Sequence, residues 1–481
     1  MLETAKETPS REIKDKKPAN KTKIALIALA VALVIGFSLY GAINHWLKAE
    51  TGTPAAEEPV REDVEIMEEE VEDEEVPVGP LDTGGETSTY TVVGLFPLSG
   101  PLSIFGENSA ETARLAETDI NSWLALEGAN WRFNLEIEDT QTSPSTALNR
   151  MQSQHDNNVN FFIGPQSSGN VEECLSYANA NEILFISPSS TAPALAIADD
   201  WLFRFCADDQ IQGPAIALLA QSAGVEHLIF GWRDDYWGGG VKGAAAAAAQ
   251  ELGISIYPQE IRYDPSKSSF SNEVMILNDY VSELIDQGVQ PGEIGFNLIA
   301  FDEATPFLAE AARYTRLAAK YAALEEIIWI GSDGSALSES LKNNSTASKF
   351  AADVKFISPL HRQQSIHGED SYYWHVNEQT RYSLGREIDS YAYITYDIAW
   401  VLAQCIHKVG YDPAAVKDIL PQVTDDWTKL HGASSHIILN EAGDRAFADF
   451  DYWVLNNSLQ WENVGYLDSQ AGKINWSRNI F

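Results

Sequence analysis

Short apolar runs alternate with longer amphipathic ones along most of the chain, and this alternation limits the possible folds more than any other feature. Seven short runs are rich in β-branched and aromatic residues, as buried strands are; they span residues 91–96, 133–137, 160–164, 183–187, 227–231, 296–301 and 326–331. Apolar residues at helical spacing predict helices over residues 107–126, 236–252, 271–287 and 305–320. Strands that alternate with helices predict parallel sheets covered on both faces. A single sheet of this length would be unusual, so we expect an α/β protein with two doubly wound lobes.

The first part of the chain has a composition that does not belong to this fold. Ile24 to Ile43 is an uncharged run of twenty residues, long enough as a helix to cross a hydrocarbon core of about 30 Å. Basic residues precede it, so everything downstream should lie outside the cell; they are Arg11, Lys14, Lys16, Lys17, Lys21 and Lys23. We expect a cytoplasmic segment over residues 1–23 and a single-pass membrane anchor over residues 24–46. A cleavable signal peptide is the alternative, although its apolar region usually has about 7–15 residues.

An acidic stretch follows the apolar run. Residues 57–75 carry twelve acidic side chains and one basic one. Like charges at this density repel one another and extend the chain, which predicts a disordered tether over residues 47–89. The whole chain has a formal net charge of −38, with 70 Asp and Glu against 32 Lys and Arg. A phosphate backbone would be repelled by such a surface, so nucleic acid is not an expected partner.

Polar residues follow several of the expected strands at their carboxyl ends, where ligands bind in open α/β sheets. Ser168 lies in the turn after strand 160–164, and Ser189 and Thr191 lie in the turn after strand 183–187. Their hydroxyl groups suit an anion such as a carboxylate, although Ser168 and Thr191 are also typical helix N-caps. Asp333 follows strand 326–331, where it is placed either to bind an ammonium group or to cap the next helix.

Motifs of the common enzyme classes are missing from the sequence. It contains no GxSxG, HExxH or GxxxxGK[ST] motif, and its nine histidines are scattered. The glycine-rich run after Tyr236 lacks the Lys-Ser/Thr of a phosphate loop. The three cysteines, Cys174, Cys206 and Cys405, have neither CxxC nor Cys/His spacing and are interpreted as buried apolar residues. We therefore expect no enzymatic activity, no cofactor and no metal site.

Taken together and in order, seven motifs resemble those of the branched-chain amino-acid (Leu/Ile/Val) binding family, the type I periplasmic binding proteins of ABC importers. The similarity extends from about Tyr90 to Trp461. The motifs are GLFPLSGPLSIFGE (94–107), EDTQTSPSTALN (138–149), IGPQSSG (163–169), ISPSSTAPAL (186–195), RFCADDQIQGPA (204–215), IGSDG (330–334) and YDIAWVLAQCI (396–406). No single motif is decisive, and the match depends on their order and spacing.

The resemblance implies a fold and a function. The fold would have three crossovers between a first lobe, residues 90–208 and 360–432, and a second lobe, residues 209–359 and 433–481. The function would be to capture a small amino acid, branched-chain or similar, between closing lobes on the extracytoplasmic side of the cell membrane. The partners would be this ligand and the permease subunits of an ABC importer.

The ligand-binding positions of the family fall on particular residues here. Ser168 and Thr191, with backbone groups near Ser189, would bind the α-carboxylate of the ligand, and Asp333 would bind its α-ammonium. Asp209 matches an acid beside the first crossing between the lobes. The aromatic positions of the family fall on Phe105, Tyr236, Phe301 and Tyr391. Hydroxyl groups on one lobe and a carboxylate on the other suit a zwitterion, because each charge then finds a partner when the lobes close.

The sequence departs from the family pattern in two ways, and two other functions stay open. Many relatives have a cysteine pair in the first lobe, which is missing here, and many are soluble or lipid-anchored rather than held by a helix. Some family members bind amides, urea or aromatic acids, so a neutral ligand is one alternative. A sensing ectodomain that signals through a partner protein is the other, because only about 23 residues lie on the cytoplasmic side.

Overall fold

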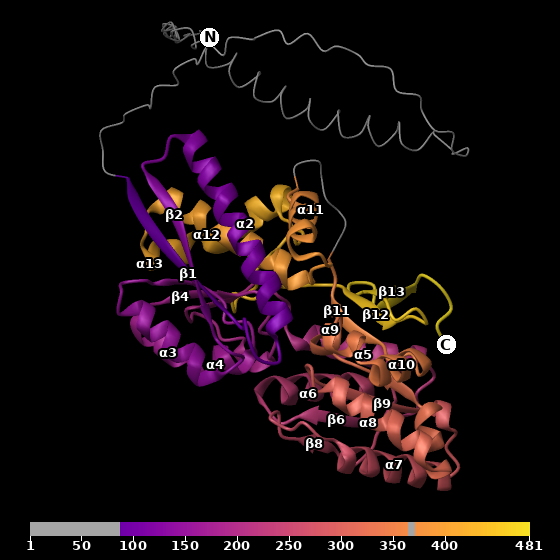
Figure 1. The fold of residues 1–481 in the computed structure, drawn as a ribbon. Helices are drawn as coiled ribbons and strands as arrows, with labels where there is room; N and C mark the ends of the chain where they lie inside the picture. Colours follow the sequence, from indigo (N-terminus) through magenta and orange to yellow (C-terminus); the bar gives the residue numbers. More distant parts are fainter. Residues whose placement is uncertain (1–86, 364–370) are drawn as a thin grey trace, which may run out of the picture. The chain divides into compact units, whose positions relative to one another are not determined.

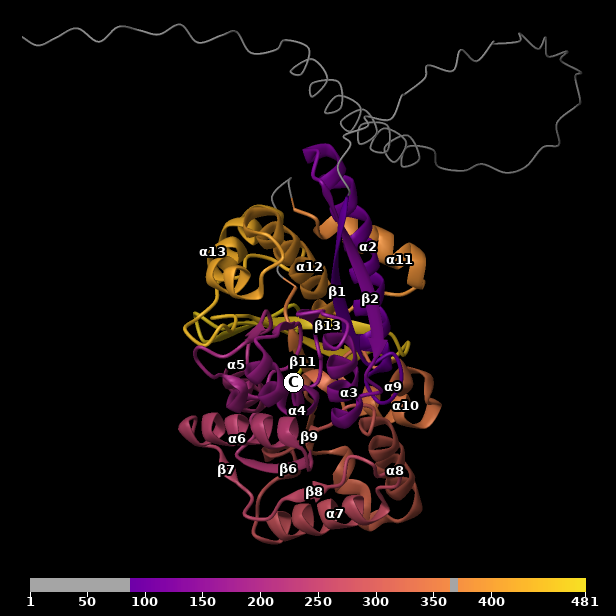
Figure 2. The same cartoon turned by 90° about the vertical axis from the view of Figure 1, so that its left-hand side faces the viewer.

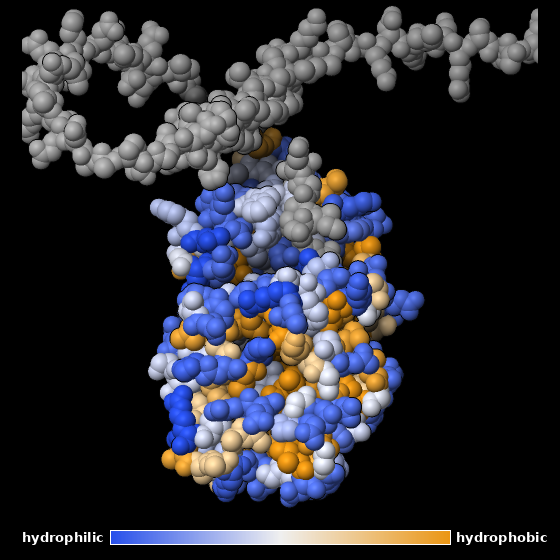
Figure 3. Space-filling view, turned by 90° about the vertical axis from the view of Figure 1, so that its right-hand side faces the viewer, coloured by the Kyte–Doolittle hydropathy of each residue, from blue (hydrophilic) through white to orange (hydrophobic). Residues whose placement is uncertain are grey.

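The structure is a computed structural model that describes residues 87–363 and 371–481, all within one compact unit. The expected cytoplasmic segment, membrane anchor and nearly all of the acidic tether lie outside the described residues. Within the described part of the chain, no helix is both long enough and apolar enough to cross a membrane. Hydrophilic residues cover most of the face in Figure 3, with apolar residues in separate groups among them.

The first sheet has five parallel strands in the order β2-β1-β3-β4-β5. They are β1 (Ser88–Phe96), β2 (Trp131–Asp139), β3 (Phe161–Ile163), β4 (Leu184–Ser187) and β5 (Leu202–Arg204). Successive residues of β1 enter different cores, because side chains of a strand alternate between the two faces of its sheet. Val92 packs in one core and Val93 in the other. Both faces are therefore covered, as the continuous apolar strands predict.

Helices from both ends of the described chain cover this sheet (Figure 1). On one face, α2 (Ser103–Glu127) packs against α12 (Ser390–Val409), which packs in turn against α13 (Pro413–His431). On the other face lie α3 (Pro144–His155) and α4 (Ser168–Asn181). The first sheet thus recruits helices that lie more than 180 residues later in the sequence.

The second sheet is also parallel and has the order β10-β9-β6-β7, with β8 paired to β6. Its strands are β6 (His227–Arg233), β7 (Ser255–Ile256), β8 (Ile261–Tyr263), β9 (Ile294–Ile299) and β10 (Ile328–Ile330). Helices cover both faces here too; they are α5 (Asp209–Ser222), α6 (Tyr236–Glu251), α7 (Ser271–Asp286), α8 (Ala304–Leu317), α9 (Glu339–Asn343) and α10 (Ser345–Asp353). The two parallel sheets with helical layers confirm the expected α/β class.

A third sheet, which the sequence did not predict, is antiparallel and has the order β11-β12-β13-β14. Its strands are β11 (Ser358–His361), β12 (Phe450–Leu455), β13 (Trp461–Asp468) and β14 (Lys473–Trp476). The Tyr452 hydroxyl donates to the Ala215 carbonyl of α5 at 2.8 Å, so this sheet packs on the second group of helices. In Figure 2 the third sheet lies between α12 and α13 on one side and the second sheet on the other.

The chain leaves the first sheet after β5, returns to it with α11 (Tyr373–Leu384), α12 and α13, and ends in the third sheet. This path places the carboxyl ends of β3 and β4 near that of β10, where the candidate site lies. The expected lobe boundaries, near residues 208, 359 and 432, stay a prediction.

Candidate ligand-binding site

Two polar turns, which follow β3 and β4, form one wall of the site. The Ser168 hydroxyl oxygen accepts a hydrogen bond from the Ala192 N–H at 3.1 Å, and the Ser189 hydroxyl donates to the Gln166 carbonyl at 3.1 Å. These bonds join the two turns. Ser168 is the first residue of α4 rather than its N-cap, which is Ser167. The capping explanation of the Ser168 hydroxyl is therefore wrong.

A buried arginine fixes the shape of the second turn. Arg204, the last residue of β5, donates from Nη1 to the carbonyls of Ser190 and Ala192, both at 2.9 Å. Its Nε and Nη2 donate to the two carboxylate oxygens of Asp444, each at 2.6 Å. Both members of this ion pair are buried. The bidentate, buried ion pair fixes the Arg204 guanidinium, and the guanidinium in turn holds the carbonyl groups on both sides of Thr191 in place.

The opposite wall contains Asp333, which begins a single 3-10 turn after β10 and is 5% exposed. Its Oδ2 accepts from the Tyr391 hydroxyl at 2.8 Å, and its Oδ1 accepts from the Gly334 N–H at 2.9 Å. A Cβ at Gly334 would lie 2.5 Å from Phe301 Cδ1, so the turn has room only for glycine. Since Tyr391 lies on α12, its hydroxyl connects the first group of elements to the second.

A second buried carboxylate lies beside the first. Asp209 begins α5 and is fully buried; Gln212 donates to Asp209 Oδ1 at 2.8 Å and accepts from the Asp333 N–H at 3.1 Å. The Thr191 hydroxyl lies close enough to lower the Asp209 pKa, yet neither Thr191 Oγ1 nor Asp209 Oδ2 has a hydrogen bond of good geometry. Gln212 thus links the two acids, whereas Thr191 Oγ1 and Asp209 Oδ2 have no hydrogen bond of good geometry.

The pKa values of both acids are raised. Burial, and then the charge of Asp333, raise the pKa of Asp209 well above its ordinary value. Burial also raises the pKa of Asp333, against hydrogen bonds from Tyr391 and Gln212 that lower it. Neither acid forms a salt bridge within the described residues, since the nearby Arg204 is occupied by Asp444. The charge of Arg204 lowers the Asp209 pKa only in part, so the pair is left without a bonded cation among the described residues.

The two walls enclose a small cavity, in which the space open to the centres of water molecules is about 30 Å³. Six of the predicted site residues line it: Phe105, Ser168, Ser189, Phe301, Asp333 and Tyr391. Thr191 and Asp209 are buried behind its walls. The remaining lining residues were not predicted, and they are Leu102, Gln166, Ser167, Trp237 and Gly334.

The aromatic side of the cavity differs from the expectation at one position. Tyr236 is 37% exposed and does not line the cavity, whereas the next residue, Trp237, stacks on Phe301 with ring centroids 4.4 Å apart. Both residues begin α6, where a step of one residue turns the side chain by about 100°. The sequence shows two adjacent aromatic residues here, but it does not show which of the two rings points into the cavity. Within the described residues, no group of three or more His, Cys, Asp or Glu side chains is placed to hold a metal ion.

Comparison of the sequence with known proteins places the chain among ligand-binding domains. Residues 108–458 match the family described as the receptor family ligand binding region. An uncharacterized protein of Methanocaldococcus jannaschii is 29% identical over 410 residues, 82% of this chain and 93% of that protein. The chemotactic signal transduction system substrate-binding protein BasB of Halobacterium salinarum is 32% identical over 136 residues, 27% of this chain and 33% of that protein.

Solved structures with a similar fold include amino-acid binding proteins. A leucine-binding protein, LivK, of Thermotoga maritima has a TM-score of 0.65 at 16% identity, over 80% of this chain and 99% of that one. The branched-chain amino-acid transporter substrate-binding protein LivJ of Streptococcus pneumoniae, in complex with isoleucine, has a TM-score of 0.62 at 16% identity, over 78% of this chain and 98% of that one. The resemblance inferred from the motifs is thus confirmed. The chain belongs to the receptor family ligand binding region, and its fold is that of the type I periplasmic binding proteins.

Proposed function

We propose that this protein is an extracytoplasmic substrate-binding protein that captures a small amino acid, branched-chain or similar, in the cavity between Asp333 and the turns at Ser168 and Ser189. The observation that carries the proposal is the pair of buried, neighbouring carboxylates, Asp209 and Asp333, with no cation bonded to either. An α-ammonium group in the cavity supplies the missing charge. Its N–H donors match the carboxylate of Asp333, which lines the cavity, and Asp209 adds negative charge from behind the wall.

The opposite wall suits the other end of a zwitterion. Ser168 begins α4, a helix of 14 residues, so its first backbone N–H groups and the positive end of its dipole favour an anion. Ser168 and Ser189 line the cavity beside this helix end, and each hydroxyl forms a hydrogen bond to the neighbouring turn. A ligand carboxylate bound here would face the two acids across a cavity that also has apolar walls, namely Phe105, Trp237 and Phe301.

The wider role follows from the sequence and from the relatives. In this proposal, residues 24–46 anchor the protein in the membrane, residues 47–89 form its tether, and the bound amino acid passes to the permease subunits of an ABC importer. Chemoreception through a partner protein is the second candidate, because the partial relative from Halobacterium salinarum serves a chemotactic signal transduction system. Co-purification of the tagged full chain separates the two: permease subunits support import, and signalling proteins support chemoreception.

Titration calorimetry on the full chain in detergent tests the ligand class. The injected compounds are the twenty amino acids, urea, acetamide and benzoate. We expect one-to-one binding of one or more amino acids that is lost when the α-ammonium is acetylated. Binding of urea or acetamide without binding of any amino acid would contradict the zwitterion and favour a neutral ligand.

A further inference from the structure

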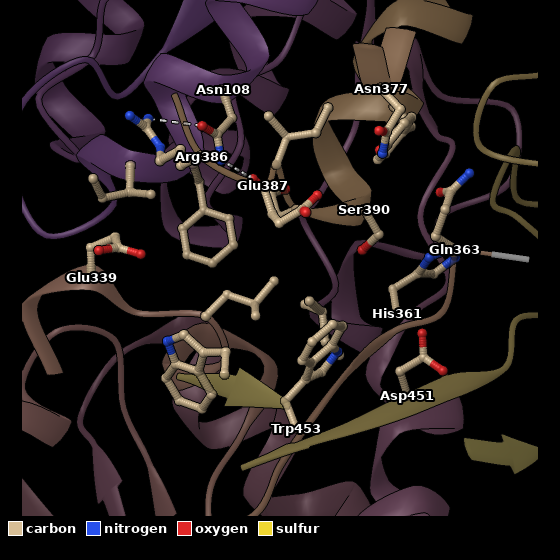
Figure 4. A pocket seen from close by; sticks show the side chains of 18 of the residues that line it. Asn108, Glu339, His361, Gln363, Asn377, Arg386, Glu387, Ser390, Asp451 and Trp453 are labelled. Carbon is tan, nitrogen blue, oxygen red and sulfur yellow. Dashed lines mark hydrogen bonds between the residues drawn. The ribbon is translucent and has the colours of Figure 1, made fainter. Parts of the chain in front are cut away.

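A second cavity lies beside the first and is considerably larger. It is enclosed by α2, β11, the segment between α11 and α12, and β12 (Figure 4). The space open to the centres of water molecules is about 330 Å³, against about 30 Å³ in the first cavity. Among the described residues, Phe105 alone lines both cavities. The ring of Tyr391 lies close to Phe105 on one side and to His361 on the other, with centroid distances of 6.3 and 6.1 Å.

Polar groups without partners are concentrated in the residues that line this second cavity. Both ring nitrogens of His361, the hydroxyl of Ser390 and the indole nitrogen of Trp453 are buried and make no hydrogen bond. His361 is 2% exposed and Ser390 is 5% exposed. The side-chain oxygen of Gln363 is also buried and makes no hydrogen bond. Figure 4 shows Gln363 on the same side of the cavity as His361 and Ser390. A buried polar group without a hydrogen-bond partner is energetically unfavourable. Several such groups around one cavity therefore favour a ligand that forms hydrogen bonds.

The charged groups around the cavity, in contrast, already have partners. Arg386 Nη2 donates to Glu107 at 2.9 Å and to Asn108 at 2.8 Å (Figure 4 shows the latter bond). Asp389 accepts from Asn108 at 2.7 Å and also caps α12. The remaining charged residues form three ion pairs, Lys342–Glu339, Arg381–Glu387 and Arg362–Asp451. Each of these residues thus has at least one partner, although Arg386 Nε makes no hydrogen bond and Asp389 forms no salt bridge among the described residues.

The groups that lack partners are mostly neutral, and they include both donors and acceptors. Burial, followed by the charge of Arg445, lowers the pKa of His361 well below its ordinary value, so its imidazole is neutral with one donor and one acceptor. Ser390 offers both a donor and an acceptor, and Trp453 offers a donor. The walls between these groups are largely flat and apolar; they include Phe105, Leu360, Ile388, Tyr393, Trp453 and Trp461.

We propose that this cavity is a second binding site, for a small uncharged planar molecule that carries a hydrogen-bond donor and an acceptor at one edge. The flat body packs between the aromatic walls, and the polar edge lies against Ser390, His361 and Trp453. The site shares Phe105 with the amino-acid site and otherwise draws on different side chains.

Three probes of nearly equal shape test the proposal: benzamide, which is neutral, benzoate, which is an anion, and benzamidinium, which is a cation. Each is titrated into the full chain in detergent by calorimetry. We expect benzamide to bind one-to-one and at least about tenfold more tightly than either ion, because burying an uncompensated charge is costly. Equal binding of an ion, or no binding of benzamide up to its solubility limit, overturns the proposal.

Two pairs of variants locate the probe. Trp453→Phe and Ser390→Ala each remove one unpartnered donor from the cavity, and each should weaken benzamide binding about two- to twelvefold. Trp400→Phe and Ser348→Ala remove equally buried, unpartnered groups that do not line the cavity, and they should leave it unchanged. If these two controls weaken binding as much as the first pair, the site is misplaced.

Asp333→Asn distinguishes the two cavities with the same probe. It should leave the affinity for benzamide unchanged, because Asp333 lines only the first cavity. Loss of benzamide binding in Asp333→Asn, together with normal binding in Trp453→Phe and Ser390→Ala, would place benzamide in the first cavity. That result overturns the second site and leaves the proposed amino-acid site to be judged by its own titrations.

Discussion

Replacing Asp333 with asparagine removes one negative charge from the amino-acid site, together with one of the two oxygens that accept hydrogen bonds from Tyr391 and Gly334. The side chain keeps its size and one oxygen that can accept from the Tyr391 hydroxyl, now 2.8 Å from Asp333 Oδ2. The ammonium group of the ligand, however, loses its charged partner inside a closed cavity. Truncating one member of a buried charge pair typically costs about 2–5 kcal/mol. At 1.4 kcal/mol per factor of ten, the affinity should fall by about 30- to 4,000-fold.

The same change should not destabilise the ligand-free protein. The charge of Asp333 is one cause of the raised Asp209 pKa, so removing it relieves a repulsion between buried acids. The lost acceptor costs about 0.5–1.5 kcal/mol and offsets this relief, so we expect the urea midpoint of ligand-free Asp333→Asn at pH 7 to stay close to that of the natural protein. Loss of affinity together with retained stability separates a binding role from a structural one.

Titration calorimetry with the tightest-binding amino acid measures the first effect, and urea unfolding followed by circular dichroism measures the second. Asp353→Asn is the matched control, because Asp353 is exposed on α10 and pairs only with Lys349. It should leave the affinity unchanged. Unchanged affinity in a folded Asp333→Asn protein would refute the reasoning from charge.

Three further changes test the surroundings of the site. Tyr391→Phe removes a hydrogen bond that lowers the Asp333 pKa, so amino-acid affinity should fall about two- to twelvefold, and further at pH 5 than at pH 8; calorimetry at both pH values checks this. Arg204→Met leaves Asp444 buried without its partner and should lower the free energy of unfolding by about 3–5 kcal/mol in urea titrations. Burial raises the pKa of Asp397 to about 7, above its value of about 3.9 in unfolded chains, so its contribution to stability is complete below about pH 4 and is lost as the pH rises to 7. In Asp397→Asn the urea midpoint should therefore depend less on pH between 4 and 7.

The sequence could predict the two parallel sheets because their strands are buried on both faces. Runs such as 91–96 and 296–301 are mostly apolar, and they overlap β1 and β9 in the structure. Their ends are less predictable, since hydrogen bonds to neighbouring strands decide where a strand stops. The nine paired residues of β1 and β2, for example, extend β1 back to Ser88.

The third sheet left no comparable signal. Its strand β12, with the sequence FDYWVL, alternates buried and half-buried residues and includes an acid among aromatic residues. Its register depends on pairs such as Ser358 with Trp453, which are 95 positions apart in the chain. Local periodicity cannot report such a pairing, because the contacts that decide it are not local.

For the site, residues with chemically distinctive side chains were easier to predict than the residues that position them. Asp333 and Ser168 stand in recognisable turns after strands. Arg204 and Gln212 act through backbone groups and through other side chains, so they have no motif of their own. Gln212 does stand three residues after Asp209 on one helix, a spacing that allows their contact.

The first cavity is small, since the space open to the centres of water molecules is only about 30 Å³. We therefore expect the wall that carries Asp333 to move away from the wall that carries Ser168 when an amino acid enters. Burial, the main cause of the raised pKa of both Asp209 and Asp333, penalises their ionised forms in the closed site, and opening lets water reach them. A ligand with an ammonium group offsets this penalty when the site closes on it, and it therefore shifts the population toward closure.

This coupling predicts that opening depends on pH. Because both pKa values are raised, lowering the pH favours the uncharged acids and a closed site, whereas raising the pH favours the ionised acids and an open one. Fluorescent dyes on Ser153→Cys in α3 and Asp279→Cys in α7 report the distance between the two walls, and the three native cysteines are buried and should not be labelled. Energy transfer in the ligand-free protein should fall from pH 5 to pH 8, and a saturating amino acid should restore it at pH 8. The same fall in Asp333→Asn would show that other groups cause it, and failure of the amino acid to restore transfer at pH 8 would contradict closure by the ammonium.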